Sequence, residues 1–142
     1  MAATGSTVLG FDYGRRRIGV AVGQHITRSA SPVAAVTARN DGPDWARLDA
    51  LLDEWRPAEL VVGLPYNADG TPHDLTREAE AFARTLAERS GLAVHTVDER
   101  LSSVEAERAL RERRAEGRRR VAKGDVDAAA ACVILESWLN RR

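Results

Sequence analysis

The chain has 142 residues, 44% of them hydrophobic, which is enough apolar material for the core of one compact domain spanning residues 1–142. Its 21 Lys and Arg residues balance 21 Asp and Glu residues, which excludes an overall positive field, so any nucleic-acid contact must depend on local basic clusters. The single cysteine, Cys132, excludes an internal disulfide and a thiolate-rich zinc site. We find neither a signal-peptide pattern nor an apolar stretch that could cross a bilayer, and therefore expect a soluble, cytoplasmic protein with no membrane partner.

The first half of the chain predicts an antiparallel meander followed by a helix. Residues 7–13 and 18–23 are apolar, β-favouring runs separated by a short polar step, as in a hairpin, and a third strand is expected at about residues 32–37. Apolar residues then recur at helical spacing until Pro57, because the residue before a proline avoids the helical conformation. The apolar positions of this first helix are Trp45, Leu48, Leu52 and Trp55.

The middle of the chain predicts a buried strand, a loop and a second helix. Residues 59–63 form a continuous apolar run that suits a strand covered on both faces, and the polar loop from Leu64 to Gly70 follows it. Thr71 is expected to be the N-cap of a helix that Gly91 closes. The predicted inner face of that helix is Leu75, Ala79, Phe82, Ala83 and Leu86.

One strand and two helices complete the predicted order. Residues 92–97 are typical of a strand, and Ser102 with Glu105 forms a capping box that opens a helix to about Glu116. An amphipathic helix is expected from Asp125 onward, and its apolar stripe is Ala130, Ala131, Ile134, Leu135 and Trp138.

This order of elements predicts an α/β fold with a mixed five-stranded sheet. The first three strands are expected to be antiparallel, and helices are expected on both faces, because a crossover to a parallel strand needs a covering helix. The same order resembles that of RNase H-like domains.

Asp12 stands where the strand pattern requires an apolar side chain. Side chains alternate along a strand, so Val8, Gly10 and Asp12 share one face. A buried carboxylate is costly unless it is paired or binds a cation, so we interpret Asp12 as part of an acidic metal site. The alternative interpretation is that Asp12 accepts hydrogen bonds in the turn near Gly14.

Further acidic residues lie at two later boundaries. Asp98 and Glu99 lie between a strand and a capped helix, where α/β folds gather ligand-binding groups, although such acids also occur in solvated turns and at helix N-termini. Asp127 lies in the first turn of the last helix on the side expected to face the sheet, whereas helix capping suits Asp125 better. If this helix packs across the first strand, three carboxylates converge.

Converging carboxylates predict a site for Mg²⁺ or Mn²⁺. These hard cations prefer oxygen ligands, activate water and stabilise the leaving oxygen of a phosphodiester. The three histidines, at positions 25, 73 and 95, are widely spaced in the sequence, so zinc is not expected.

Basic residues cluster in two segments that could attract a phosphate backbone. Residues 111–114 have a second interpretation as the solvated face of a helix that also carries Glu105, Glu107 and Glu112. The clustered residues are Arg15, Arg16 and Arg17 in the first hairpin, and Arg111, Arg113, Arg114, Arg118, Arg119, Arg120 and Lys123 near Asp127.

Four stretches, in order, resemble the YqgF-type family of pre-16S ribosomal RNA nucleases, also described as Holliday-junction-resolvase-like. The stretches are residues 9–23 (LGFDYGRRRIGVAVG), 60–71 (LVVGLPYNADGT), 97–106 (VDERLSSVEA) and 123–135 (KGDVDAAAACVIL), and the resemblance spans about residues 8–139. It implies an RNase H-like fold, hydrolysis of nucleic acid with a divalent metal, and trimming of the 5′ end of the 16S ribosomal RNA precursor during ribosome biogenesis.

The resemblance also implies roles for individual residues. Asp12 corresponds to the first acid, Glu99 to the second with Asp98 as its rival, and Asp127 to the third. The number of metal ions stays open, because Gly124 stands three residues before Asp127, where related resolvases have an acid. The implied contacts to nucleic acid include Asn67 and Asp69, which otherwise cap the following helix, and Arg100.

Three other functions remain open at this stage. One alternative is a nuclease whose substrate is branched DNA instead of RNA. Another is a non-catalytic RNA- or ribosome-binding module with the same fold. The strand–turn–strand around Asp12 also resembles the phosphate-binding hairpin of actin-like and sugar-kinase ATPases, but those enzymes need a second lobe, for which 142 residues leave no room. Both a monomer and a homodimer are compatible with the sequence.

Overall fold

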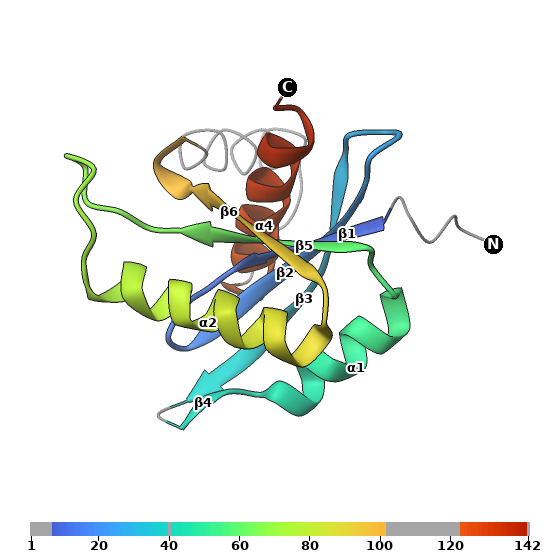
Figure 1. Ribbon diagram of the computed structural model, residues 1–142, viewed down its shortest axis with the longest axis horizontal. Helices are drawn as coiled ribbons and strands as arrows, with labels where there is room; N and C mark the ends of the chain where they lie inside the picture. The colour runs from blue at the N-terminus through green and yellow to red at the C-terminus, as the bar shows by residue number, and fades with distance from the viewer. Residues whose placement is uncertain (1–6, 40, 102–122, 142) are drawn as a thin grey trace.

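The computed structural model describes residues 7–39, 41–101 and 123–141, and the fold is shown in Figure 1. The strands are β1 (Thr7–Asp12), β2 (Arg17–Gln24), β3 (Ala30–Arg39), β4 (Gly42–Pro43), β5 (Glu59–Leu64) and β6 (Ala93–Asp98). The helices are α1 (Trp45–Trp55), α2 (Asp74–Ser90), the short 3-10 helix η1 (Glu99–Leu101) and α4 (Lys123–Leu139). Within these ranges, no helix combines the length and hydropathy of a membrane span.

The strands form one mixed sheet in the order β4-β3-β2-β1-β5-β6. Strands β1 to β4 pair antiparallel, whereas β5 pairs parallel with both β1 and β6. The predicted mixed sheet with an antiparallel meander is therefore confirmed. It has six strands instead of five, because Gly42 adopts a φ of +111° and lets a two-residue strand pair with the end of β3.

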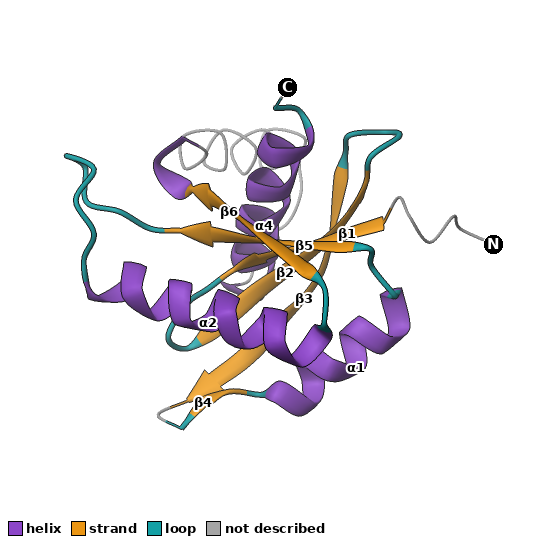
Figure 2. Ribbon diagram, viewed as in Figure 1, coloured by secondary structure: helices purple, strands orange, loops and turns teal. Residues whose placement is uncertain are grey.

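Helices cover both faces of the sheet, as predicted. Helices α1 and α2 lie on one face and α4 lies on the other (Figures 1 and 2). The alternation along β1 decides which side chain meets which helix: Leu9 and Phe11 belong to the core beneath α1 and α2, whereas Val8 packs with Ile134 and Leu135 of α4. The side chains of Asp12 and Val8 lie on the same face of β1, so the side chain of Asp12 also faces α4.

The helix ends show one wrong prediction. Helix α1 stops before Pro57, and Gly91 caps α2, as expected. The N-cap of α2, however, is His73 instead of Thr71, because His73 Nδ1 accepts a hydrogen bond from the Leu75 amide (3.2 Å). Leu75 is only half-buried, and its place on the inner face is taken by Thr76.

The last part of the chain contains one confirmed helix and one prediction that stays untested. Helix α4 begins at Lys123, two residues before the predicted start at Asp125, and buries Ala131, Ile134 and Leu135 as expected. The helix predicted from Ser102 to about Glu116 lies outside the described residues.

Candidate active site at the end of strand β1

Asp12, the last residue of β1, has a glycine beside it on each neighbouring strand. It pairs with Gly19 of β2 and with Gly63 of β5. A Cβ atom at Gly19 would lie 1.9 Å from the carbonyl oxygen of Asp127, and one at Gly63 would lie 2.9 Å from Cγ of Glu99. Because neither glycine has a side chain, Asp127 and Glu99 can approach Asp12 from its two sides.

The Asp12 and Glu99 carboxyl groups lie close enough to shift each other's pKa. Burial raises the pKa of Asp12 well above its ordinary value, and the negative charges of Glu99 and Asp127 raise it further. Burial also raises the pKa of Glu99, to which the charge of Asp98 adds. Ionising both carboxyl groups at once is therefore costly unless a positive charge lies beside them.

Asp127 contacts a basic residue instead of the other two carboxyl groups. Arg17 Nε donates a hydrogen bond of 2.7 Å to Oδ2 of Asp127, and both side chains are half-buried. Arg17 begins β2, two residues before Gly19, so the ion pair joins this strand to the N-terminal part of α4 beside Asp12.

The structure separates the two rival acids at the end of β6. The carboxylate of Asp98 accepts hydrogen bonds from the Arg100 amide (2.9 Å) and from Nη2 of its guanidinium (2.7 Å). These hydrogen bonds, together with the charge of Arg100, lower the pKa of Asp98. Asp98 is thus committed to Arg100, and Glu99 is the acid that reaches Asp12.

Arg100 also fixes the loop between β5 and α2. Its Nη1 donates to the carbonyl oxygen of Ala68 (3.3 Å), and its guanidinium lies 5.9 Å from the ring centroid of Tyr66. Within the same loop, Thr71 donates to Asp69 Oδ1 through its amide (3.0 Å) and its hydroxyl (2.7 Å), and these bonds lower the pKa of Asp69. The loop held by these hydrogen bonds lies at the carboxyl end of β5.

Asn67, a candidate contact to nucleic acid, takes part in the same hydrogen-bond network of the loop. Its Nδ2 donates to Oγ1 of Thr71 (2.9 Å), which accounts for a loop-shaping role of this exposed side chain. The predicted helix-capping role of Asn67 and Asp69 is not seen, because the cap of α2 is His73.

The predicted basic contacts have different environments. Arg15 makes a bidentate ion pair with Glu78 of α2 (2.8 Å for the shorter Nη2 bond), whereas Arg16 is exposed. Lys123 is the first residue of α4, and Arg118, Arg119 and Arg120 lie outside the described residues.

The donor set at Asp12 suits Mg²⁺ or Mn²⁺, although it is not preassembled. In the described ranges, no three His, Cys, Asp or Glu side chains form a group that could hold a metal ion as they stand. At this site, Asp12 lies close to Glu99, whereas Asp127 pairs with Arg17. Carboxylates are the preferred ligands of both cations, and burial makes the ionised pair costly without a positive charge.

The sequence interpretation missed Arg17 as the partner of Asp127 and Gly19 and Gly63 as the floor of the site. The two glycines carried a readable signal, since a glycine inside a strand often marks a close approach of other backbone or ligand atoms. The link from Arg17 to Asp127 had no such signal, because it spans 110 positions.

A second polar cluster lies at the opposite end of α4. His25 and His95 each place Nε2 against Glu59, at 2.7 and 2.9 Å, and both imidazole rings pack against Trp138. These residues border a cavity of about 640 Å³ that Arg141 also lines. Distant spacing in the sequence thus did not prevent two histidines from meeting at one carboxylate.

We predict that this cluster stabilises the fold above pH 4.5. Burial alone would raise the pKa of Glu59, but hydrogen bonds from His25 and His95 outweigh it and lower the pKa below its ordinary value of 4.5. A lowered pKa in the folded state means that the stabilisation is present above pH 4.5 and is lost as the pH falls through the folded value. Urea unfolding should show Glu59→Gln less stable than wild type by about 1 kcal/mol at pH 7 and a smaller difference near pH 3.5. A difference that does not change with pH would contradict this prediction.

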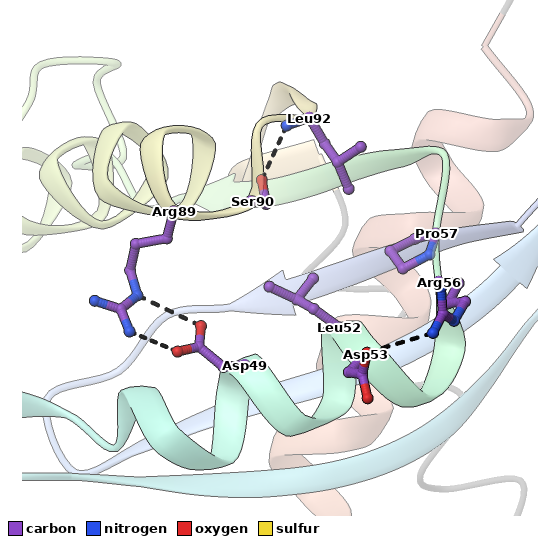
Figure 3. A pocket seen from close by; sticks show the side chains of 8 residues that line it. All are labelled: Asp49, Leu52, Asp53, Arg56, Pro57, Arg89, Ser90 and Leu92. Atoms are coloured by element: carbon purple, nitrogen blue, oxygen red, sulfur yellow. Dashed lines mark hydrogen bonds and ion pairs between the residues drawn. The ribbon is translucent and has the colours of Figure 1, made fainter.

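Another hollow, of about 480 Å³, lies between the C-terminal ends of α1 and α2 (Figure 3). The Arg89–Asp49 ion pair crosses it at 2.5 Å, and Asp53 at its edge is 82% exposed. This hollow lies among the helices of the face opposite α4, and so takes no part in the Asp12 site. Asp53 therefore supplies a control position for substitutions at the candidate site.

The structure has the RNase H-like fold that is also found in Holliday junction resolvases. The structure is similar to RuvC of T. thermophilus in complex with a Holliday junction substrate, with a TM-score of 0.61 and 19% identity over 94% of this chain and 93% of that one. It is also similar to the fowlpox virus resolvase bound to Holliday junction DNA, with a TM-score of 0.55 and 10% identity over 95% of this chain and 99% of that one.

The chain belongs to the RuvX family, described as Holliday junction resolvase, whose model matches residues 6–141. It is 52% identical to a relative from Azotobacter vinelandii over 95% of this chain and 94% of the relative. It is 50% identical to one from Sodalis glossinidius over 99% and 98%. Both relatives carry the name "Putative pre-16S rRNA nuclease". The resemblance found in the sequence is confirmed, and the family and fold support a hydrolytic nuclease that binds nucleic acid.

Proposed function

We propose that this chain is a divalent-metal-dependent endonuclease that processes the 5′ end of the 16S ribosomal RNA precursor. The observation that carries the proposal is the setting of Asp12 at the end of β1, where two glycines admit Glu99 and Asp127. Three acids from distant parts of the sequence thereby surround one end of the sheet. The names of the RuvX-family relatives support the choice of RNA substrate.

In this proposal, Asp12, Glu99 and Asp127 hold Mg²⁺ or Mn²⁺. The bound cation supplies activation of water and stabilisation of the leaving oxygen. The chain's contribution is to fix the acids on rigid elements: Asp12 on a central strand, Glu99 on η1 and Asp127 on α4. The basic side chains near the site then orient the phosphate backbone through charge and hydrogen bonds.

Branched DNA is the second candidate substrate. The description of the family model and the DNA complexes of the fold relatives favour it. A four-way DNA junction therefore belongs in the same assay as the precursor RNA. Binding of either substrate without cleavage would instead support the non-catalytic module.

The test is a cleavage assay on the precursor RNA and on a four-way DNA junction, with Mg²⁺, with Mn²⁺ and with EDTA. We expect cleavage that needs the cation in wild type and its loss in Asp127→Asn. Asp53→Asn makes the same chemical change at an exposed position outside the site and should cleave like wild type. Equal cleavage by all three proteins, or full activity in EDTA, would refute the proposed mechanism.

We predict that Glu99→Gln and Asp98→Asn differ sharply in the same assay. Glu99 contacts Asp12, so its amide variant should lose cleavage by a factor on the order of a hundred or more. Asp98 binds Arg100, so its amide variant should retain most of the turnover rate and lose some thermal stability. The initial cleavage rates at saturating substrate decide between the two acids. The reverse order of the two rates would identify Asp98 as the ligand.

A further inference from the structure

We propose that Arg17 is a positioning residue that occupies Asp127 in the metal-free protein and releases it when a nucleic-acid phosphate binds the guanidinium. Metal and nucleic acid would then bind cooperatively. The inference rests on the proposed metal-dependent nuclease function and adds to it an order of events at the site.

The geometry of the Arg17–Asp127 ion pair places the exchange at the site itself. Arg17 Nε lies 2.7 Å from Asp127 Oδ2, and the two side chains are 37% and 25% exposed, so solvent and solutes can reach them. The backbone of Asp127 rests on Gly19, which is the partner of Asp12 across β1 and β2. The carboxylate of Asp127 is therefore held beside Asp12, and the cation that it binds there is the Arg17 guanidinium.

A metal ion shared by the three acids must compete with Arg17 for the Asp127 carboxylate. The ion pair thus lowers the affinity of the free protein for the cation. The size of this effect is that of one partly exposed ion pair.

Nucleic acid offers Arg17 an alternative anion. Guanidinium groups bind phosphate at least as well as carboxylate, through two parallel hydrogen bonds. Arg17 lies in the β1–β2 hairpin next to the exposed Arg16, where a phosphate backbone approaching Asp12 would meet it. Binding of phosphate to Arg17 leaves Asp127 available to the metal, and by linkage the metal must favour nucleic acid by the same factor.

The first experiment titrates Mn²⁺ alone into metal-free protein by calorimetry. We expect Arg17→Gln to bind Mn²⁺ roughly twofold to fivefold more tightly than wild type. Arg17→Lys keeps the positive charge and should stay near wild type, as should Arg16→Gln, which removes the neighbouring exposed charge. Unchanged or weaker binding by Arg17→Gln would overturn the proposal. So would an equal gain in Arg16→Gln, because the effect would then be one of net charge.

The second experiment repeats the titration with a saturating, cleavage-resistant 2′-O-methyl RNA oligonucleotide. Mn²⁺ affinity should rise in wild type and change little in Arg17→Gln, and an equal rise in both would overturn the coupling. If Arg17→Gln fails to fold, the wild-type titration alone still tests the proposal. A Mn²⁺ affinity of wild type that the oligonucleotide does not change would overturn the coupling. Asp12→Asn separates the two hypotheses: if it binds Mn²⁺ like wild type, the proposed metal site is wrong whatever Arg17 does.

Discussion

Gly19→Ala is expected to destabilise the protein by about 3 kcal/mol and to abolish most of its cleavage activity. The new Cβ would lie 1.9 Å from the carbonyl oxygen and 2.4 Å from the carbonyl carbon of Asp127, both of which are backbone atoms. No side-chain rotation can relieve such a clash, so the N-terminal part of α4 must move away from β2. Asp127, which we propose as a metal ligand, would move with it.

The measurement for Gly19→Ala is urea unfolding together with the cleavage rate. Gly91→Ala is the matched control: its Cβ meets nothing within 4 Å, but its φ of +70° makes alanine unfavourable by about 1 kcal/mol. That control should lose a little stability and cleave normally. If Gly19→Ala loses no more stability than Gly91→Ala, the close packing of α4 on β2 is wrong.

Asp12→Asn is expected to be more stable than wild type at pH 8 in EDTA and nearly inactive. Burial raises the folded-state pKa of Asp12, so its stabilisation is complete below the ordinary value of 3.8 and is lost as the pH rises through the folded value. At pH 8, wild type bears the cost of a crowded, partly desolvated carboxylate, which a neutral amide of the same shape avoids. The gain should be about 1–2 kcal/mol, and cleavage should fall on the order of a thousandfold.

Thermal unfolding at pH 4 and pH 8 checks this result. The advantage of Asp12→Asn should shrink or vanish at pH 4, where wild type also carries a proton at the site. Excess Mg²⁺ should raise the melting temperature of wild type more than that of Asp12→Asn, since a ligand stabilises the state that binds it. A variant that is less stable than wild type at pH 8 in EDTA would show that Asp12 contributes to folding through hydrogen bonds instead.

The sequence predicted the elements that depend on local periodicity. The alternation along β1 assigned Asp12 to the face of Val8, and the stripe of Ala131 and Ile134 turned Asp127 toward the sheet. Both assignments agree with the structure, because side-chain parity in a strand and the spacing of a helix are properties of a few neighbouring residues. The six-residue β1 and the 17-residue α4 gave these patterns enough length to be read.

Features that depend on competition between polar groups could not be predicted in this way. Asp98 and Glu99 are adjacent acids, and only the position of the Arg100 guanidinium shows which of them remains for Asp12. The helix cap moved from Thr71 to His73 for a similar reason, since the Thr71 hydroxyl is already bound to Asp69. In each case several partners have suitable chemistry, and tertiary geometry selects one.

Helix α4 is held at both ends, which has a mechanical consequence for the site. Near its N-terminal end, Asp127 rests on Gly19, and its last turn carries Trp138, which packs against two imidazole rings. Asp127 and Trp138 are eleven residues apart, or roughly 16 Å along the axis at 1.5 Å per residue. A tilt of α4 by one degree about Trp138 would shift Asp127 by about 0.3 Å. The packing of Trp138 at the C-terminal end of the helix therefore helps to set the position of Asp127 near its N-terminal end.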